Sequence, residues 1–325
     1  MPLKHTLAGT CIGLFVCAAA SAQSNYPSRP ITMTIPFAAG GPMDSVGRPI
    51  AQFMSKVLRH QVIVDNVGGA GGTIGTARVA KSEPDGHTIL LHHIGHATSA
   101  SLYRKLSYDP LNDFEPIGLV AEVPMTFVAR NSFPPKDAKE LLVYVKANKD
   151  KVSLANAGVG SASHLCGMMF MSSISTDLVT VSYKGTGPAM NDLLGEQIDL
   201  MCDLSTNVMS HAKAGKIKAY ATTARDRNPL QPNIPSMRET GLPNVEVVVW
   251  YGLYAPKNTP RTAIDKLSAA LRSVVSDADL RQRFTDMGAT LVPEQRATPE
   301  ALRAHLKSEI ERWAPVIRNA GIYAD

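Results

Sequence analysis

The chain has 325 residues, of which 44% are hydrophobic and 19% are charged, the balance of an ordinary soluble globular protein. Its formal net charge is +5, but lysine and arginine are spread along the chain without a long basic block, which argues against a nucleic acid partner. A mild positive balance suits a small anionic ligand instead.

The first 22 residues have the pattern of a secretory signal peptide. A short basic start precedes an apolar run over residues 7–19, and Ala20, Ser21 and Ala22 form a small-residue cleavage pattern. The alternative is a membrane anchor, but a span needs about 20 apolar residues and this run is shorter. We therefore expect export to the periplasm with cleavage after Ala22. The mature chain, residues 23–325, is long enough for two lobes.

The first part of the mature chain alternates short apolar runs with segments of helical apolar spacing. These patterns predict strands at 31–35, 62–64 and 88–92, and helices at 46–58 and 76–81. Pro49 lies within the first helical pattern, so that helix is either kinked there or begins near Arg48. A β-α-β-α-β order of this kind predicts a parallel sheet with helices on its faces.

A second α/β set follows, and the chain closes with helices. The patterns predict strands at 115–120, 125–129, 152–155, 179–182, 198–202, 219–223 and 245–254. They predict helices at 138–149, 164–173, 208–214, 261–276, 278–287 and 299–320, and one that opens at 184–188 and runs to 194.

The closing helices have no strands of their own, so they must pack on an existing sheet. Two lobes with crossing segments near 120–128 and 245–252 fit this order best. We expect lobe 1 to comprise residues 23–124 and 249–325, and lobe 2 to comprise residues 125–248. A cleft between two lobes is a common place for a small ligand.

Two glycine-rich turns follow strands of the first lobe. In residues 36–44 the turn leads into a helix start, where bare backbone N–H groups favour anions. Asp44 is expected to cap that helix and to keep its charge back from the site. Residues 68–75 resemble a dinucleotide fingerprint, but Ile74 occupies the third glycine position. A second anion-facing loop is therefore favoured there, and a plain turn is the alternative at both places.

The loop over residues 156–164 follows a strand and opens a helix in the second lobe. Ser161 and Ser163 offer hydroxyl groups, while nearby glycines allow close backbone approach. The glycine spacing is not that of a G-x-S-x-G nucleophile elbow. A ligand-binding loop is favoured, and a serine hydrolase that uses Ser161 or Ser163 with a distant histidine remains the alternative.

Two further polar positions follow strands of the second lobe. Residues 183–187 form another strand-to-helix turn, and Asp203 follows the predicted strand 198–202. The carboxyl ends of parallel strands are where α/β folds bind ligands. Asp203 is therefore a candidate ligand contact, with a cap or turn role as the alternative.

Four histidines, His87, His92, His93 and His96, form a loose cluster. No cysteine lies near them and no H-E-x-x-H motif is present, so no metal and no cofactor is predicted. Successive residues of a strand point in opposite directions, so at most one of His92 and His93 faces the cleft. His93 is the candidate ligand contact.

Taken together, the segments resemble the Bug, or TctC-like, family of periplasmic solute receptors of tripartite tricarboxylate transporters. The matching segments include PFAAGGPMD at 36–44, NVGGAGGTIG at 66–75, PDGHTILL at 84–91, GSASH at 160–164 and VSYKGTGPAMNDLLGEQIDLMCD at 181–203. The resemblance implies an α/β, two-lobed Venus flytrap fold, with a mainly parallel sheet flanked by helices in each lobe and the second lobe inserted in the first.

The resemblance also implies a set of ligand contacts. Those of the first lobe are Phe37, Ala38, Gly40, Asp44, Gly71 and Thr73, and those of the second are Ser161, Ser163, His164, Thr186, Gly187 and Asp203. Met43 and Pro49 depart from the commonest family pattern, which puts the local helix geometry in doubt.

Two cysteines, Cys166 and Cys202, lie outside the predicted signal peptide. In an oxidising compartment such a pair is typical of a disulfide, with two separate buried thiols as the alternative. Paired cysteines also recur in part of the resembled family, which supports a Cys166–Cys202 bridge.

The main hypothesis is an exported, monomeric, non-enzymatic receptor that binds an organic carboxylate and delivers it to integral-membrane permease subunits. Di- and tricarboxylates, amino acids and aromatic carboxylates such as terephthalate all remain open as ligands. The alternatives are a secreted serine-dependent hydrolase and a carboxylate sensor for a signalling partner.

Overall fold

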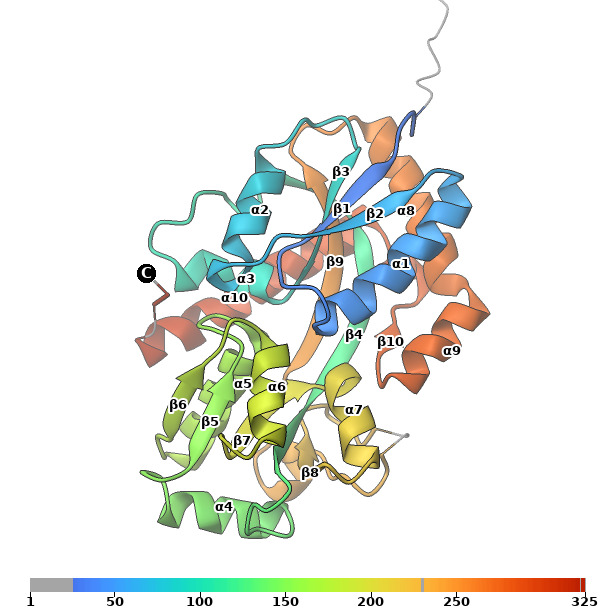
Figure 1. Cartoon of the computed structure of the whole chain (residues 1–325). Coiled ribbons are helices and arrows are strands. Elements are labelled where there is room, and N and C mark those ends of the chain that lie inside the picture. The colour runs from blue at the N-terminus through green and yellow to red at the C-terminus, as the bar shows by residue number, and fades with distance from the viewer. Residues whose placement is uncertain (1–25, 229–230, 322, 325) are drawn as a thin grey trace, which may run out of the picture.

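A computed structural model describes residues 26–228, 231–321 and 323–324 of the chain. It shows two α/β lobes, one built from the blue, cyan and orange-red parts of the chain and the other from the green and yellow parts (Figure 1). The predicted signal peptide, residues 1–22, lies outside the described residues. Within the described residues, no helix is both long and apolar enough to span a membrane.

The sheet of lobe 1 has the strand order β2-β1-β3-β9-β4. Strand β1 is parallel to β2 and β3, whereas β9 runs antiparallel between β3 and β4. The strands are β1 (Ile31–Ile35), β2 (Val62–Asn66), β3 (Thr88–His93), β4 (Phe114–Arg130), β9 (Val248–Pro256) and the short β10 (Thr290–Leu291), which pairs with β4. The helices are α1 (Pro42–Leu58), η1 (Ala70–Gly72), α2 (Thr73–Ala80), α3 (Gly95–Leu102), α8 (Arg261–Ser276), α9 (Ala278–Asp286), η3 (Glu294–Arg296) and α10 (Pro299–Ala320).

In lobe 2, β4 continues and pairs with two antiparallel strands, β7 and β8. Strands β7, β5 and β6 are parallel to one another. The strands are β5 (Ser153–Asn156), β6 (Val179–Ser182), β7 (Leu200–Leu204) and β8 (Ile217–Thr222), and the helices are α4 (Ala138–Ala147), α5 (Ala162–Ile174), α6 (Thr186–Leu194), α7 (Ser205–Lys213) and η2 (Met237–Thr240).

Strand β4 passes from one lobe to the other without a break. Its pairing with β9 ends at Pro124. Its pairing with β7 begins at Met125, and its pairing with β8 begins at Thr126. The sequence patterns predict two separate strands here, at 115–120 and 125–129. The prediction of a break is wrong, since Pro124 lies where the partner strands change.

The second crossing, just before β9, is tied to the first by Thr223. Its hydroxyl donates to Val247 O over 2.6 Å and accepts the Met125 N–H over 3.0 Å. Thr223 is buried, so these bonds hold the two crossing segments side by side at the junction of the lobes.

The predicted α/β, two-lobed fold class is confirmed, but the sheets are mixed rather than mainly parallel, because β4 and β9 run antiparallel to their neighbours. Most elements lie within a few residues of their predicted bounds. Helices α8 and α10 match their predicted bounds, and α10 has a Thr298 cap that accepts the Ala301 N–H. Helix α1 starts at Pro42 rather than at residue 46, because proline fits the first turn of a helix. Pro49 therefore lies inside α1 rather than at its start.

Helix α3 and strand β10 were not predicted from the sequence. The α3 segment GHATSASL contains glycine, threonine and serine, which are weak helix formers, and it lacks a clear apolar stripe. Most of α3 is buried and the helix packs against α10. Tertiary packing therefore stabilises a helix that local propensity does not indicate.

Candidate functional site

A cavity of about 140 Å³ lies between the lobes, at the carboxyl ends of β1, β3, β5, β6 and β7. Both lobes contribute to it. Its lining residues are Phe37, Ala38, Ala39, Gly40, Gly41, Pro42, Met43, His93, Met125, Ala157, Ser161, Ala162, Ser163, Lys184, Gly185, Thr186, Gly187, Pro188, Asp203 and Leu204.

Four helices begin at this cavity. The N-cap residues of α1, α5, α6 and α7 are Gly41, Ser161, Gly185 and Leu204, and all four line it. The first N–H groups of a helix have no acceptor within the helix, and the helix dipole adds partial positive charge there. Convergence of four such ends, one from lobe 1 and three from lobe 2, makes the cavity suited to an anion.

The turn of lobe 1, residues 36–44, is held by Asp44 from behind. The Asp44 carboxylate accepts the Gly40 N–H over 3.0 Å, Arg48 Nε–H over 2.7 Å and an Asn66 amide N–H over 3.1 Å. Asn66 also donates to Phe37 O over 3.1 Å. Burial alone raises the pKa of Asp44, but these partners outweigh burial and hold the pKa below its usual value.

The predicted capping role of Asp44 is wrong. The N-cap of α1 is Gly41, which has no side-chain cap, and Asp44 lies three residues further on. Asp44 does not line the cavity. Its charge is compensated by Arg48 within lobe 1, so it shapes the loop and keeps its charge from the site.

The loop of lobe 2 that precedes α5 is held by its own serines and histidine. Ser161 caps α5 by accepting the His164 N–H over 3.2 Å, and Ser163 accepts the Ala157 N–H over 2.7 Å. Both serines line the cavity, but His164 does not. The His164 ring accepts the Gly160 N–H through Nδ1 over 3.2 Å, and burial lowers the pKa of His164.

This geometry does not support a serine hydrolase. The Ser161 and Ser163 hydroxyls bond to each other over 3.0 Å. In the part of the chain that the structure describes, neither hydroxyl is hydrogen bonded to a histidine ring. A nucleophilic serine needs an adjacent base to remove its proton.

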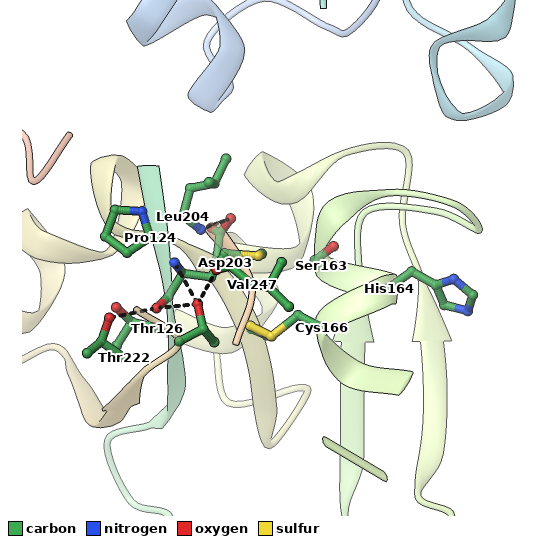
Figure 2. Close-up of a disulfide and its surroundings, with 12 residues drawn as sticks. Pro124, Thr126, Ser163, His164, Cys166, Asp203, Leu204, Thr222 and Val247 are labelled. Atoms are coloured by element: carbon green, nitrogen blue, oxygen red, sulfur yellow. Dashed lines mark hydrogen bonds between the residues drawn. A yellow bond between two sulfur atoms is a disulfide. The ribbon is translucent and has the colours of Figure 1, made fainter. Parts of the chain in front are cut away.

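Asp203 stands at the end of β7, and its side chain is fully buried. Its carboxylate accepts the Leu204 N–H over 2.8 Å and an amide N–H of Asn207, one turn into α7. Burial raises the pKa of Asp203 to about 7, although these two hydrogen bonds act in the opposite direction. Figure 2 shows Asp203 at the end of lobe 2 that faces the segments of lobe 1.

The predicted disulfide is present, and it lies beside Asp203. Cys166 of α5 is bonded to Cys202 of β7, which immediately precedes Asp203 (Figure 2). The bond ties α5, whose N-cap is Ser161, to β7, which contains Asp203, so two parts of the cavity wall are covalently connected.

Of the two adjacent histidines, His93 lines the cavity and His92 does not. His93 packs against Phe37 with ring centroids 4.8 Å apart, and its Nδ1 accepts the Gly95 N–H over 2.9 Å. Burial lowers the pKa of His93 to about 4, so its ring is neutral at neutral pH. Among the described residues, no group of histidine, cysteine and acidic side chains is placed to hold a metal ion.

Nine of the predicted contacts line the cavity: Phe37, Ala38, Gly40, His93, Ser161, Ser163, Thr186, Gly187 and Asp203. Gly71 lines a larger adjoining cavity of about 800 Å³, whose wall includes Tyr103 and Tyr183. Thr73 lines neither cavity, since its hydroxyl donates to Ala70 O and closes the turn before α2.

Several lining residues were not among the predicted contacts. Met125 lines the cavity because β4 continues through the junction between the lobes, and Leu204 because β7 ends two residues later than predicted. Met43 lines it because α1 begins early. Lys184 belongs to a turn that the sequence singles out, and its neighbours Thr186 and Gly187 were predicted contacts.

Solved structures with the same fold place this chain in a class. The periplasmic binding protein BugD is 50% identical, with a TM-score of 0.89 and coverage of 92% of this chain and 99% of BugD. MatC from Rhodopseudomonas palustris, solved with bound malate, is 41% identical, with a TM-score of 0.85 and coverage of 90% of this chain and 100% of MatC. The fold and the cavity between the lobes define a periplasmic binding protein.

The family follows from the sequence comparisons. The family model described as the tripartite tricarboxylate transporter family receptor, TctC, matches residues 46–322. A UPF0065 protein of Agrobacterium vitis, from the TAR-I ttuE-ttuC' intergenic region, is 47% identical over 302 residues, which cover 93% of this chain and 87% of the relative. The chain belongs to this receptor family, as its resemblance predicted.

Proposed function

We propose that this protein captures an organic carboxylate in the cavity between its lobes and delivers it to the membrane subunits of a tripartite transporter. The observation that carries the proposal is the convergence of four helix N-termini, from both lobes, on one small cavity. It is supported by the malate bound to MatC, a relative 41% identical to this chain.

Closure of the lobes would couple binding to delivery. Lobe 1 offers the N-terminus of α1, and lobe 2 offers those of α5, α6 and α7, so either lobe alone gives an incomplete set of donors. A carboxylate that contacts both lobes stabilises the closed arrangement by its higher affinity for it. The closed form is then what the membrane subunits recognise.

The lobe boundaries and export are part of the same proposal. We take lobe 1 as residues 23–124 and 249–325 and lobe 2 as residues 125–248. The change of partner of β4 after Pro124 supports the first boundary, and the start of β9 at Val248 lies within one residue of the second. The protein acts as a monomer in the periplasm after cleavage of its signal peptide. Uptake assays in cells, compared with signalling assays, separate delivery to a transporter from a sensory role.

Gly187, in the first turn of α6, gives a direct test of the anion site. A Cβ atom added there meets no atom within 4 Å, so the backbone position has room for a side chain to begin. We expect some carboxylates of a broad panel to raise the melting temperature of the wild type. A ligand present at 100 times its Kd adds about 2.7 kcal/mol to the free energy of unfolding. In Gly187→Asp, the added negative charge should weaken binding of the same compounds at least tenfold by calorimetry.

The matched control is Val143→Asp, which adds the same charge at a residue of α4 that is 71% exposed and not among the lining residues. It should bind like the wild type. Equal binding by the wild type and Gly187→Asp would contradict the proposed site, and a panel without any ligand would contradict the proposed function.

A further inference from the structure

Asp203 presents a buried acidic group to the cavity without a cationic partner. Within the described residues its only hydrogen-bond donors are the Leu204 N–H and the neutral amide of Asn207, and it forms no ion pair. An ionised carboxylate offers about four acceptor positions, so part of its hydrogen-bonding capacity is unfilled. Burial of such a charge is costly unless a donor or a counter-charge meets it.

The groups that face Asp203 from neighbouring elements do not neutralise it. Thr126 of β4 lies opposite Asp203 in the β4–β7 register. The titratable side chains around it are His93 of β3, which lines the same cavity and is neutral, Tyr251 of β9, and Lys184 of the turn before α6. Lys184 is exposed at the cavity wall.

Tyr251 adds a second unsatisfied polar group on the lobe 1 side. Its hydroxyl is buried and has no hydrogen-bond partner among the described residues. Burial raises the pKa of Tyr251, and the nearby charge of Asp203 raises it further, so the phenol stays protonated. The Tyr251 ring also lies 6.2 Å from the ring of His93, which lines the cavity.

We propose that Asp203 is the acceptor for a hydrogen-bond donor on the ligand, so that the site selects carboxylates that also carry an amino or hydroxyl group. The inference rests on the proposed function and names the class of carboxylate. The helix N-termini bind the ligand carboxylate, while an ammonium or hydroxyl group on the same molecule fills the free acceptor position of Asp203. A ligand without such a donor can be met only by the protonated form of Asp203.

The three kinds of ligand then differ in their dependence on pH. Because burial raises the pKa of Asp203 to about 7, both forms of this carboxyl exist near neutral pH. An ammonium ligand needs the ionised form, so its affinity falls about tenfold from pH 8 to pH 6, and binding at pH 6 releases a proton to the buffer. An unsubstituted dicarboxylate needs the protonated form, so its affinity falls about tenfold from pH 6 to pH 8. A hydroxyl group can donate to the ionised form of Asp203 or accept from the protonated form, so the affinity of a hydroxy acid depends least on pH.

The test is isothermal titration calorimetry of the mature protein with two matched sets of dicarboxylates. The sets are aspartate, malate and succinate, and glutamate, 2-hydroxyglutarate and glutarate, each measured at pH 6, 7 and 8. We expect opposite pH slopes for the amino and unsubstituted members of the set that binds. In Asp203→Asn both slopes should vanish, and the affinity of the amino acid at pH 8 should fall at least tenfold relative to its unsubstituted analogue.

Slopes of the same sign in the wild type, or unchanged ligand ratios in Asp203→Asn, would overturn the inference, as would absence of binding by all six compounds. The pH profile uses the wild-type chain, so it tests the inference even where the variant does not fold. If unsubstituted dicarboxylates bind, and an amino or hydroxyl group on the ligand changes neither the affinity nor its pH dependence, only this inference fails. If the broad carboxylate panel yields no ligand, the proposed function fails as well.

Discussion

Two buried aspartates lie next to the cavity, one in each lobe, and their environments shift their pKa values in opposite directions. Asp44, behind the turn of lobe 1, has an arginine, an amide and a backbone N–H as partners, and its pKa is lowered. Asp203, at the end of β7 in lobe 2, has only neutral donors, and its pKa is raised to about 7. Burial opposes ionisation in both, but Asp203 is the more deeply buried and has neither the cationic partner nor the third donor that Asp44 has.

The comparison separates a structural role from a functional one. The charge of Asp44 is neutralised within lobe 1, so this residue can stabilise the loop in the absence of a ligand. Among the described residues Asp203 has only neutral hydrogen-bond donors and no ion-pair partner, so its charge is not neutralised within lobe 2 as that of Asp44 is within lobe 1. Burying the ionised Asp203 carboxylate costs free energy, and a ligand that donates a hydrogen bond to it would remove part of that cost.

The largest expected effect comes from the bond that fixes Asp203 in place. Replacing Cys166 and Cys202 by serine together should lower the free energy of unfolding by about 4 kcal/mol, because the bridge closes a loop with a sequence separation of 36 residues. Urea unfolding of the wild type and the variant measures this difference. Reductant should destabilise the wild type and leave the variant unchanged, whereas an equal response would contradict the prediction.

Asp203→Asn should stabilise the empty protein at alkaline pH. Burial raises the pKa of Asp203 in the folded state from its ordinary value of 3.8 to about 7, so the native state binds the proton more tightly than the unfolded state. The cost of ionising Asp203 is therefore absent below about pH 4, grows as pH rises, and is complete above about pH 7. We expect the variant to be more stable than the wild type by about 4 kcal/mol at pH 8 and by much less at pH 4.

The difference in unfolding free energy between variant and wild type, measured from pH 4 to 8, isolates Asp203 from the buried histidines. A difference that does not change with pH would show that Asp203 has no raised pKa, and the contrast with Asp44 would disappear.

Asp44→Asn should have the opposite sign. The lowered pKa of Asp44 means that its stabilisation is present above the unfolded pKa and is lost as pH falls through the folded pKa. Loss of charge-assisted hydrogen bonds to a buried acceptor should cost about 2 kcal/mol at pH 7. Chemical denaturation at pH 7 and at low pH measures it.

Arg48→Gln is the matched control for Asp44→Asn. The Arg48 side chain is 54% exposed, so its removal should cost less than about 1 kcal/mol and should leave Gly40 and Asn66 bonded to Asp44. If the two variants are equally destabilised, the ion pair rather than the whole network holds the turn.

The smallest effect concerns the cap at the start of α5. Ser161→Ala removes the acceptor of the His164 N–H and should cost about 1 kcal/mol in thermal unfolding. Ser172→Ala, at an exposed position near the end of the same helix, should change stability by less than about 0.5 kcal/mol. A similar loss in both variants would argue against a capping role for Ser161.

The sequence identifies the parts of the site that depend on local chemistry. The turns at 36–44, 156–164 and 183–187 are recognisable because glycine and serine follow an apolar strand and precede a helical pattern, and all three contribute to the cavity wall. The bounds of α8 and α10 follow from strong apolar periodicity.

The remaining features depend on residues far apart in the sequence. The role of Asp44 requires Asn66, which lies 22 positions away, and the exposure of Met125 to the cavity requires β4 to continue past Pro124. Helix α3 forms because α10 packs against it, although its own sequence is a poor helix former. The Asp44–Arg48 pair has the i, i+4 spacing of a helical ion pair, but the predicted helix begins at residue 46 and so leaves Asp44 outside it.

The shared strand β4 also fixes an order of assembly. Residues 114–222 contain every strand of lobe 2, so that sheet can form from a continuous stretch of chain. The sheet of lobe 1 needs β9 between β3 and β4, and β9 begins only at Val248. As the chain emerges from the N-terminus onward, lobe 2 can complete its sheet first, while the earlier strands of lobe 1 wait for a segment encoded more than 100 residues later.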